Sequence, residues 1–269
     1  MITDVDGTLL TPEKVLTLRA SAAVRGLAAA GIGFTLVSSR PARAMMSLIA
    51  ALDLKLPFAA FNGGAVVNTN LSMIETHRLD PGAASTMLDL LTRRGVDAWV
   101  FADNDWRLRN AHGAYVVDNQ RTLGYPPVIV QGFDDVISRI DKIVGVSGRP
   151  ALLVEVAAEA RTMLPGQATI NLSRPCYLDV THPEANKGDA VKALCKILGV
   201  DLDRTAVLGD MMNDIAMFDV AGLAIAMGQS PDIVKAHAQV ITGANTEDGF
   251  ANGIERIIRS RVSRSAHHY

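Results

Sequence analysis

The chain has 269 residues, of which 49% are hydrophobic and 20% are charged, and its 26 basic and 28 acidic residues give a formal net charge of −2. The length and composition predict an ordinary globular protein, with either one large α/β domain or two smaller domains. The balanced charge argues against nucleic-acid binding, and no apolar run reaches the roughly 18 residues that cross a membrane.

Three smaller features concern the cellular compartment and the protein surface. Cys176 and Cys195 lack the spacing of metal ligands, so free thiols in a reducing compartment are expected. Asp4 comes too early for a signal peptide. The basic stretch from Arg256 to Arg264 is expected to be the solvated end of a helix, where positive charges suit the helix dipole. The expected free thiols, the lack of a signal peptide and the lack of a membrane-spanning run predict a cytoplasmic protein.

The first 64 residues alternate between helical and strand patterns. Helices are expected over Arg19–Ala30, which stops before a helix-ending Gly31, and over Ala42–Leu52. Short buried strands are expected over Gly33–Val37 and Phe58–Phe61. Alternation at this pace predicts parallel strands joined by crossover helices.

The middle of the chain follows a different pattern. Helices are expected over Pro81–Arg93 and Ala151–Ala160, a hairpin turn at Asn104-Asp105, and a loop over Tyr115–Gln131. Strands joined by hairpins, with a few helices, predict an α+β module whose sheet is partly antiparallel. The expected strands are Ala98–Phe101, Trp106–Leu108, Lys142–Val146, Ala168–Leu172 and Cys176–Val180.

After Asn186 the alternation of helices and strands returns. The expected fold is therefore α/β, a Rossmann-like parallel sheet core with an inserted α+β cap domain. The core would comprise residues 1–79 and 183–269, and the cap residues 80–182. The expected elements of this last part are helices over Gly188–Leu198, Asp210–Val220, Ile233–Ala238 and Gly249–Ile258, and strands over Ala206–Leu208, Leu223–Ala226 and Val240–Ile241.

The start of the chain is unusual for this fold. Only Met1-Ile2-Thr3 precede Asp4, whereas a central strand normally has about five residues. Either the first strand is unusually short, or the natural chain begins upstream of Met1.

Four groups of polar residues follow the predicted core strands or begin a core helix. In an open parallel sheet, reactive groups gather at the carboxyl ends of the strands. These residue types suit the handling of a phosphoryl group. The groups are Asp4 with Asp6, Ser38 with Ser39, Lys187, and Asp210 with Asn213 and Asp214.

The paired aspartates indicate a divalent metal ion. Asp4 and Asp6 are one residue apart, so an extended backbone would direct both to the same side. Adjacent carboxylates repel each other, and a cation or a shared proton is needed to hold them together. Asp210 and Asp214, expected one helical turn apart, can complete an all-oxygen shell of the kind that favours Mg²⁺ over zinc.

Each group taken alone has a simpler interpretation. The segment Asp4–Gly7 could be a plain turn, whereas a calcium loop is excluded because its glycine and third ligand are misplaced. Ser38 and Asp210 could be helix caps, and Lys187 could be a solvated lysine. Phosphoryl chemistry is favoured because all four groups occur together and in order.

With these groups in view, the chain resembles phosphatases of the haloacid dehalogenase superfamily over nearly its whole length. Ser38 and Ser39 stand where Thr-Gly is common in the second motif of that family. Three further segments resemble the Cof-type subfamily, which has a large C2B-like cap: Asn62-Gly63-Gly64, Ala226-Met227-Gly228 and Glu247-Asp248-Gly249. The four family motifs are similar to Asp4-Val5-Asp6-Gly7-Thr8, Val37–Pro41, Asn186-Lys187-Gly188 and Gly209–Asp214.

The resemblance implies two-step covalent catalysis with Mg²⁺ as the cofactor. Asp4 would attack phosphorus to form an aspartyl-phosphate, and Asp6 would act first as acid and then as base. Mg²⁺ would be held by Asp4, the backbone carbonyl of Asp6 and Asp210, with Asp214 fixing a metal-bound water or lying closer to the ion. The phosphoryl oxygens would contact Ser38, Lys187, Asn213 and the backbone N–H groups of Val5 and Ser39.

The expected partner is a small phosphate ester, and no nucleic-acid or membrane partner is expected. The sequence gives no information on the oligomeric state. A sugar phosphate is expected because similar large-cap enzymes hydrolyse them, while pyridoxal phosphate and other small esters stay open. A phosphomutase and a non-catalytic phosphate-binding protein on the same fold are the alternatives. The cap candidates for sugar stacking or anion contact are Trp99, Trp106, Arg107, Arg109, His112 and Tyr115.

Overall fold

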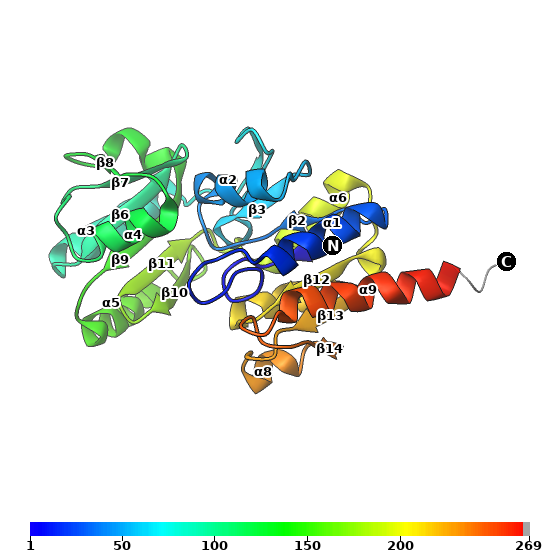
Figure 1. Ribbon diagram of the computed structural model, residues 1–269. Coiled ribbons are helices and arrows are strands. Elements are labelled where there is room, and N and C mark those ends of the chain that lie inside the picture. The colour runs from blue at the N-terminus through cyan, green and yellow to red at the C-terminus, as the bar shows by residue number, and fades with distance from the viewer. Residues whose placement is uncertain (266–269) are drawn as a thin grey trace.

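The computed structural model describes residues 1–265 and shows two lobes, each built around its own sheet (Figure 1). The larger lobe, the core, holds a five-stranded parallel sheet made from the two ends of the chain. The smaller lobe, the cap, holds a six-stranded and mainly antiparallel sheet made from the middle of the chain. This architecture confirms the predicted fold class.

The strand that precedes Asp4 lies inside the core sheet, whose order is β14-β13-β12-β1-β2. Although β1 has two residues, it is paired on both sides, with Ile2 opposite Val207 and Thr35. The backbone N–H of Asp4 continues the ladder and donates to the carbonyl of Leu208 at 2.9 Å. The strands are β1 (Ile2–Thr3), β2 (Thr35–Leu36), β12 (Ala206–Gly209), β13 (Leu223–Ala226) and β14 (Val240–Ile241).

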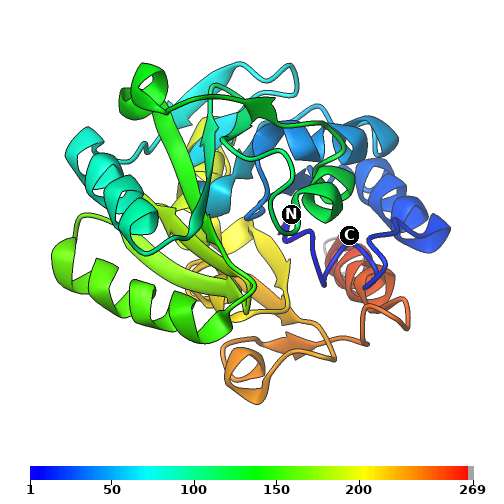
Figure 2. The ribbon, with the colours of Figure 1, turned by 90° about the vertical axis from the view of Figure 1, so that its left-hand side faces the viewer.

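Helices cover both faces of the core sheet, because successive side chains of a strand point to opposite sides. Leu208 belongs to a hydrophobic cluster with residues of α1 and α9, whereas Val207 belongs to one with residues of α6 and α7. Helices α1 and α9 lie side by side in both views (Figures 1 and 2). The core helices are α1 (Leu18–Ala29), α2 (Ala42–Ala51), α6 (Lys187–Leu198), α7 (Ile215–Phe218), α8 (Asp232–Lys235) and α9 (Gly249–Ser265), with the 3₁₀ turns η3 (Leu202–Arg204) and η4 (Met212–Asp214).

A hydrogen bond from the side chain of Asn186 fixes where helix α6 begins. The Oδ1 atom of Asn186 accepts the backbone N–H of Asp189 at 2.9 Å, which satisfies one of the free donors of the first turn. The helix ends at Gly199, whose φ of +63° is left-handed. The helix-capping side chain of Asn186 therefore sets the position of Lys187, the first residue of the helix.

The strand predicted over Phe58–Phe61 is present, and it starts an antiparallel unit of three strands, not predicted from the sequence, that extends the edge of the core. Strand β3 (Phe58–Ala60) runs parallel to the end of β2 through a bridge between Val37 and Ala59. After the 3₁₀ turn η1 (Phe61–Gly63), strands β4 (Ala65–Val67) and β5 (Met73–Thr76) fold back antiparallel. Strand β5 leads into the first linker to the cap.

The cap packs helices α3 and α5 against one face of its sheet and turns the other face toward the core (Figure 2). Val100 and Ile143 belong to the cluster that includes both helices. On the opposite face, the ring of Phe101 lies 6.1 Å from the ring of Phe61 in the core. The cap elements are α3 (Pro81–Arg93), β6 (Asp97–Ala102), β7 (Asp105–Leu108), α4 (Val116–Leu123), β8 (Val128–Ile129), η2 (Asp134–Arg139), β9 (Ile140–Val146), α5 (Pro150–Met163), β10 (Thr169–Arg174) and β11 (Tyr177–Thr181).

The prediction of a loop over Tyr115–Gln131 was wrong, because this segment contains helix α4 and strand β8. Helix α4 begins after Tyr115 and ends at Gly124, both of which have a left-handed backbone. Val116 and Leu123 are its buried residues, and the rest of the helix is largely exposed. Two buried positions give too little periodicity to indicate a helix, so packing against the core decides this structure.

The single helix predicted over Asp210–Val220 is broken into η4 and α7. The reason is the side chain of Asp214, which accepts backbone N–H groups of Asp210 and Met211 and so closes a turn instead of continuing a helix. Helix α8 is also shorter than the predicted Ile233–Ala238.

Two remaining predictions concern the surface. Within residues 1–265, no helix combines the length and apolar character needed to cross a membrane. In the basic stretch Arg256–Arg264, Arg256 is exposed and donates to the carbonyl of Ile241 at 3.3 Å. The side chains that follow Ile258 lie outside the described residues.

Candidate active site

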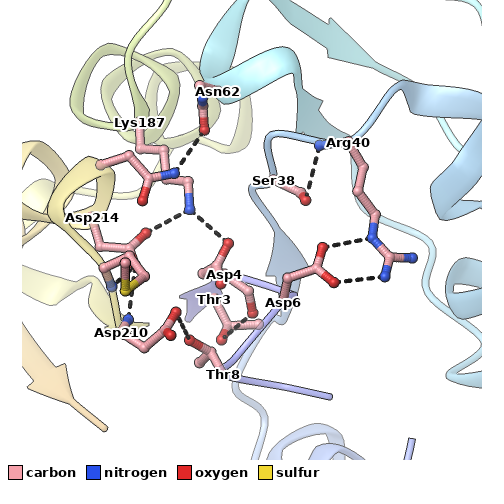
Figure 3. Close-up of polar contacts among 12 residues, drawn as sticks. Thr3, Asp4, Asp6, Thr8, Ser38, Arg40, Asn62, Lys187, Asp210 and Asp214 are labelled. Carbon is pink, nitrogen blue, oxygen red and sulfur yellow. Dashed lines mark hydrogen bonds and ion pairs between the residues drawn. The ribbon is translucent and has the colours of Figure 1, made fainter. Parts of the chain in front are cut away.

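Neighbouring strands of the core bring the candidate site residues to one edge of the sheet. Asp4 follows β1, Ser38 comes just after β2, and Asp210 follows β12. Strand β1 pairs with both of the others, so these three residues lie side by side. Figure 3 shows Lys187 and Asp214 meeting them from α6 and η4.

Lys187 joins two carboxylates inside the protein. Its Nζ atom donates to Oδ1 of Asp4 at 2.6 Å and to Oδ1 of Asp214 at 2.5 Å (Figure 3). The side chain of Lys187 is 1% exposed, and those of Asp4 and Asp214 are 6% and 0% exposed. Burial lowers the pKa of Lys187, but the two carboxylates outweigh burial and raise it above its ordinary value. The lysine is therefore a fixed positive charge.

Asp214 also holds the chain that follows β12. Its Oδ2 atom accepts the backbone N–H groups of Asp210 at 2.8 Å and of Met211 at 2.9 Å. Asp210 lies in the loop before η4, so the two aspartates are not one turn apart on a regular helix as the sequence predicted. One carboxylate thus positions both Lys187 and the backbone of Asp210.

Asp4, Asp210 and Asp214 can hold a divalent metal ion. One carboxylate oxygen of each lies within 4.8 Å of the other two, and all three residues are buried. Burial, reinforced by Asp214, raises the pKa values of Asp4 and Asp210, even though Lys187 opposes the shift. Three carboxylates thus share one lysine, and a divalent cation would compensate the negative charge that this lysine leaves unbalanced. The all-oxygen donor set fits a hard cation.

Two glycines allow the chain to approach these carboxylates closely. A Cβ atom on Gly7, whose φ is +87°, would lie 2.2 Å from Oδ2 of Asp210. A Cβ atom on Gly209 would lie 2.5 Å from Cγ of Asp214. Next to Gly7, the Oγ1 atom of Thr8 donates to Oδ1 of Asp210 at 3.2 Å. The Gly7-Thr8 pair of the first motif therefore fits against Asp210 and orients it.

Asp6 belongs to a second group of charges. Its carboxylate accepts two hydrogen bonds from Arg40, both at 2.7 Å (Figure 3). It also accepts one from Nζ of Lys14 at 2.6 Å. Burial alone would raise the pKa of Asp6, but the hydrogen bonds and charges of Arg40 and Lys14 lower it to about 2. In this arrangement Asp6 is ionised, so it can accept a proton but has none to donate.

Three of the predicted phosphate-binding residues lie around Asp4 in different environments. Ser38 is buried, and its Oγ atom accepts the backbone N–H of Arg40 at 3.2 Å in the turn before α2, so it does not cap that helix. Ser39 lines the cavity beside Asp4. The side chain of Val5 is fully buried in the core, so only its backbone can face a ligand.

A cavity of about 770 Å³ lies between the site and the cap. Asp4, Asp6 and Lys187 line it on the core side. On the cap side it is lined by Lys142 and Asp179, whose charged atoms are 2.6 Å apart and whose side chains are 10% and 14% exposed. The cavity therefore has charged groups on both its core side and its cap side.

Of the six cap residues proposed for substrate contact, Trp99 lines this cavity. Lys142 and Asp179 were missed, because a charge within a strand pattern gives no sign of which face it occupies. The other five residues lie elsewhere: Trp106 is buried in the cap, Arg107 and Arg109 contact other cap side chains, and His112 and Tyr115 are exposed.

Sequence reasoning also missed residues that shape the core side of the site. Arg40 stands inside the second motif, and a basic residue at that place was an available signal. Lys14 lies in a loop and gave no signal. Asn62 was noted only as part of a glycine-rich segment; it lines the cavity, and its Oδ1 atom accepts from Nδ2 of Asn213 at 3.0 Å. Asn213, a predicted phosphate-binding residue, lines the cavity as well.

Comparison with known proteins agrees with this arrangement. Residues 1–254 match the family described as haloacid dehalogenase-like hydrolase. The 5-amino-6-(5-phospho-D-ribitylamino)uracil phosphatase of Bacillus subtilis is 28% identical over 252 residues, which cover 93% of this chain and 92% of that protein. A haloacid dehalogenase-like hydrolase from Bacteroides thetaiotaomicron has a TM-score of 0.89 at 24% identity, covering 95% of this chain and 98% of that one. A sugar phosphatase of subclass IIB has a TM-score of 0.81 at 20% identity, covering 95% and 97%.

Proposed function

The chain belongs to the haloacid dehalogenase-like hydrolases and is a phosphatase of that family, and we propose that it hydrolyses a sugar phosphate with Mg²⁺ through an aspartyl-phosphate at Asp4. The observation that carries the proposal is the buried contact of Lys187 with Asp4 and Asp214, of which Lys187 and Asp4 line the cavity. A fixed positive charge beside Asp4 lets an anionic phosphate approach an anionic nucleophile.

In the first step, a carboxylate oxygen of Asp4 attacks phosphorus, and the bond from phosphorus to the leaving oxygen breaks. Lys187 uses two N–H groups of Nζ on Asp4 and Asp214, so the third can be donated to a phosphoryl oxygen. Ser38, Asn213 and the backbone N–H groups of Val5 and Ser39 would bind the other phosphoryl oxygens. The leaving oxygen takes a proton from Asp6, which must first take up that proton from solvent as its ion pairs with Arg40 and Lys14 loosen.

In the second step, a water molecule attacks the phosphorus atom of the aspartyl-phosphate, and the bond to Asp4 breaks. Asp6 takes the proton of this water, and inorganic phosphate leaves. The ionised carboxylate that Arg40 and Lys14 hold is the form that this step needs.

Mg²⁺ would be held by the carboxylates of Asp4 and Asp210 and the backbone carbonyl of Asp6, with Asp214 beside them. Its charge would offset the repulsion between the nucleophile and the phosphate. Mg²⁺ fits better than zinc because the buried donors are carboxylate oxygens without histidine or cysteine.

The cap wall of the cavity supports a hydroxyl-rich leaving group. Lys142 and Asp179 present a donor and an acceptor, and Trp99 presents an apolar ring face. Sugars combine hydroxyl groups with apolar C–H faces, which matches this mixture. Because burying an ion pair costs desolvation energy, its place in the cavity wall favours a role in binding over one in stability.

Phosphate release from a panel of sugar phosphates, pyridoxal phosphate and 4-nitrophenyl phosphate tests the proposal. We expect release in MgCl₂ and none above background in EDTA. Asp4→Asn should abolish release and keep the circular dichroism spectrum, whereas the control Asp53→Asn, whose side chain is 83% exposed, should stay active. Wild type quenched during turnover should carry a hydroxylamine-sensitive phosphoryl group, and Asp4→Asn should not.

Two outcomes would contradict this function. Interconversion of sugar phosphates without phosphate release would identify a phosphomutase. Phosphate binding without turnover of any ester would identify a non-catalytic binding protein.

The substrate class is tested at the cap. Lys142→Met and Asp179→Asn should each raise KM for the preferred sugar phosphate about tenfold or more, the effect of losing a hydrogen bond to a charged group. The same variants should change KM for 4-nitrophenyl phosphate, which has no hydroxyl groups, by about twofold or less. Equal effects on both substrates would exclude sugar recognition by this pair.

A further inference from the structure

The two linkers that join the cap to the core lie against each other. The first linker follows β5 and begins at His77, and the second follows β11 and contains His182 and Glu184. The ring centroids of His77 and His182 are 5.4 Å apart. Residues far apart in the sequence therefore meet where the cap is attached.

His77 lies between two carboxylates. Its Nε2 atom is 3.2 Å from Oε1 of Glu75, and its Nδ1 atom is 3.4 Å from Oε2 of Glu184. A neutral imidazole has a single N–H, so it can donate to one of the two carboxylates while its other nitrogen presents a lone pair to an oxygen. A proton or a metal cation between Nδ1 and Glu184 removes that repulsion. A ring whose Nε2–H donates to a carboxylate is also oriented in the way typical of metal-bound histidines.

His182 supplies a second nitrogen. Its Nδ1 atom accepts the backbone N–H of Glu184 at 3.1 Å, so this nitrogen has a lone pair and no proton. One potential ligand atom from each of His77, His182 and Glu184 lies within 4.8 Å of the other two. Ligation through Nδ1 of His182 would exchange its present hydrogen bond for a metal bond.

From these contacts we propose that His77, His182 and Glu184 form a site for one divalent cation of the zinc type, with a fourth position open to water. Two imidazole nitrogens and one carboxylate oxygen are donors that zinc takes, at distances of about 2.0–2.2 Å. The oxygen-only cluster around Asp4 favours a different class of cation. A cation bound at the linkers ties together the two connections between cap and core.

Zinc titration of the metal-stripped protein in excess MgCl₂ tests the site, because Mg²⁺ then occupies the oxygen cluster. We expect the wild type to bind one more equivalent of Zn²⁺ than His77→Gln or Glu184→Gln, measured by calorimetry. Zn²⁺ should also raise the Tm of the wild type and leave that of both variants unchanged. With Co²⁺ in place of Zn²⁺, only the wild type should show the visible absorption of a four-coordinate site.

The choice of variants keeps the result decisive. Glu184 is exposed, so Glu184→Gln keeps the fold even where a histidine substitution does not. His237→Gln is the matched control, because His237 pairs with a single carboxylate, Asp219, at 2.8 Å. Equal Zn²⁺ stoichiometry in wild type and Glu184→Gln, or loss of the extra equivalent in His237→Gln, would overturn the proposal. No substrate is needed, so the result is independent of the proposed phosphatase chemistry.

Discussion

Replacing Lys187 with methionine should destabilise the protein strongly, although methionine is similar in size. The substitution leaves Asp4 and Asp214 buried without the cation that lies 2.6 and 2.5 Å from their oxygens. Removing one partner of a buried ion pair costs about 3–5 kcal/mol, a large part of the roughly 5–15 kcal/mol that stabilises a folded domain. We expect the free energy of unfolding in EDTA to fall by this amount.

Urea unfolding followed by circular dichroism measures the effect, and Lys192→Met provides the matched control. Lys192 is on the same helix and pairs with Asp189 at 2.8 Å, but both side chains are about half exposed. An exposed pair contributes about 0–1 kcal/mol, so the control should lose little. Losses for the two variants that agree within about 1 kcal/mol would refute the reasoning, because burial would then make no difference.

The pH dependence of the Lys187→Met deficit gives a second check on its cause. Burial already raises the pKa of Asp4, and losing Lys187 raises it further. A carboxyl group whose pKa is raised on folding favours the folded state below its unfolded pKa, and this advantage disappears as the pH rises through the folded pKa. The deficit should therefore be smaller near about pH 5 than near about pH 8. A deficit independent of pH would mean that unpaired carboxylates are not its source.

Three further predictions concern the rest of the site. Arg40→Met should raise the pKa of Asp6 from about 2 toward its ordinary value, because Arg40 contributes the largest of the effects that lower this pKa. Titration of the Asp6 carboxyl group by ¹³C NMR measures the pKa, and an unchanged value would exclude Arg40 as the cause. Gly7→Ala should cost more than about 3 kcal/mol in urea unfolding because its Cβ would meet Asp210, whereas Gly166→Ala, with a similar φ of +71° and open space, should cost only about 1 kcal/mol. Mg²⁺ should raise Tm more at about pH 8 than at about pH 5, because burial raises the pKa of Asp210 to about 6 and protons compete with Mg²⁺ for this carboxylate at lower pH. An equal rise in Tm at both pH values would place the ion elsewhere.

The core sheet could be predicted because its strands are short apolar runs buried on both faces. Val207 and Leu208 show this, since they enter clusters on opposite sides of the sheet and both must be apolar. The motif glycines were equally informative. Gly7 and Gly209 lie where a side chain would collide with Asp210 or Asp214, so their presence reflects a physical requirement of the site.

Helix α4 could not be predicted because its structure depends on contacts from outside the segment. The guanidinium of Arg43, on α2, lies 4.4 Å from the ring centroid of Tyr125, just beyond the end of α4. Helix α4 itself also contacts α2. Local periodicity carries no information about such a partner.

The membership of the candidate site could be predicted, but the pairing within it could not. The spacing of Asp4 and Asp6 predicted that both would face one side, and both line the same cavity. Their partners differ, however, because Asp4 contacts Lys187 whereas Asp6 contacts Arg40. The spacing of two residues indicates to which side of the backbone their side chains point. The cation that each carboxylate contacts depends on elements far away in the sequence.

This division into two charge groups matches the two tasks that the proposed chemistry sets. The side chains of Lys187, Asp4 and Asp214 are at most 6% exposed, so breaking one of their ion pairs would leave a buried charge without a partner. The Asp6 group has side chains 11–37% exposed, so water can replace an ion pair at little cost. A nucleophile must keep its position in every turnover, whereas an acid/base group must gain and lose a proton. The energetic difference between the groups therefore supports the proposed mechanism, in which Asp4 is fixed and Asp6 exchanges a proton.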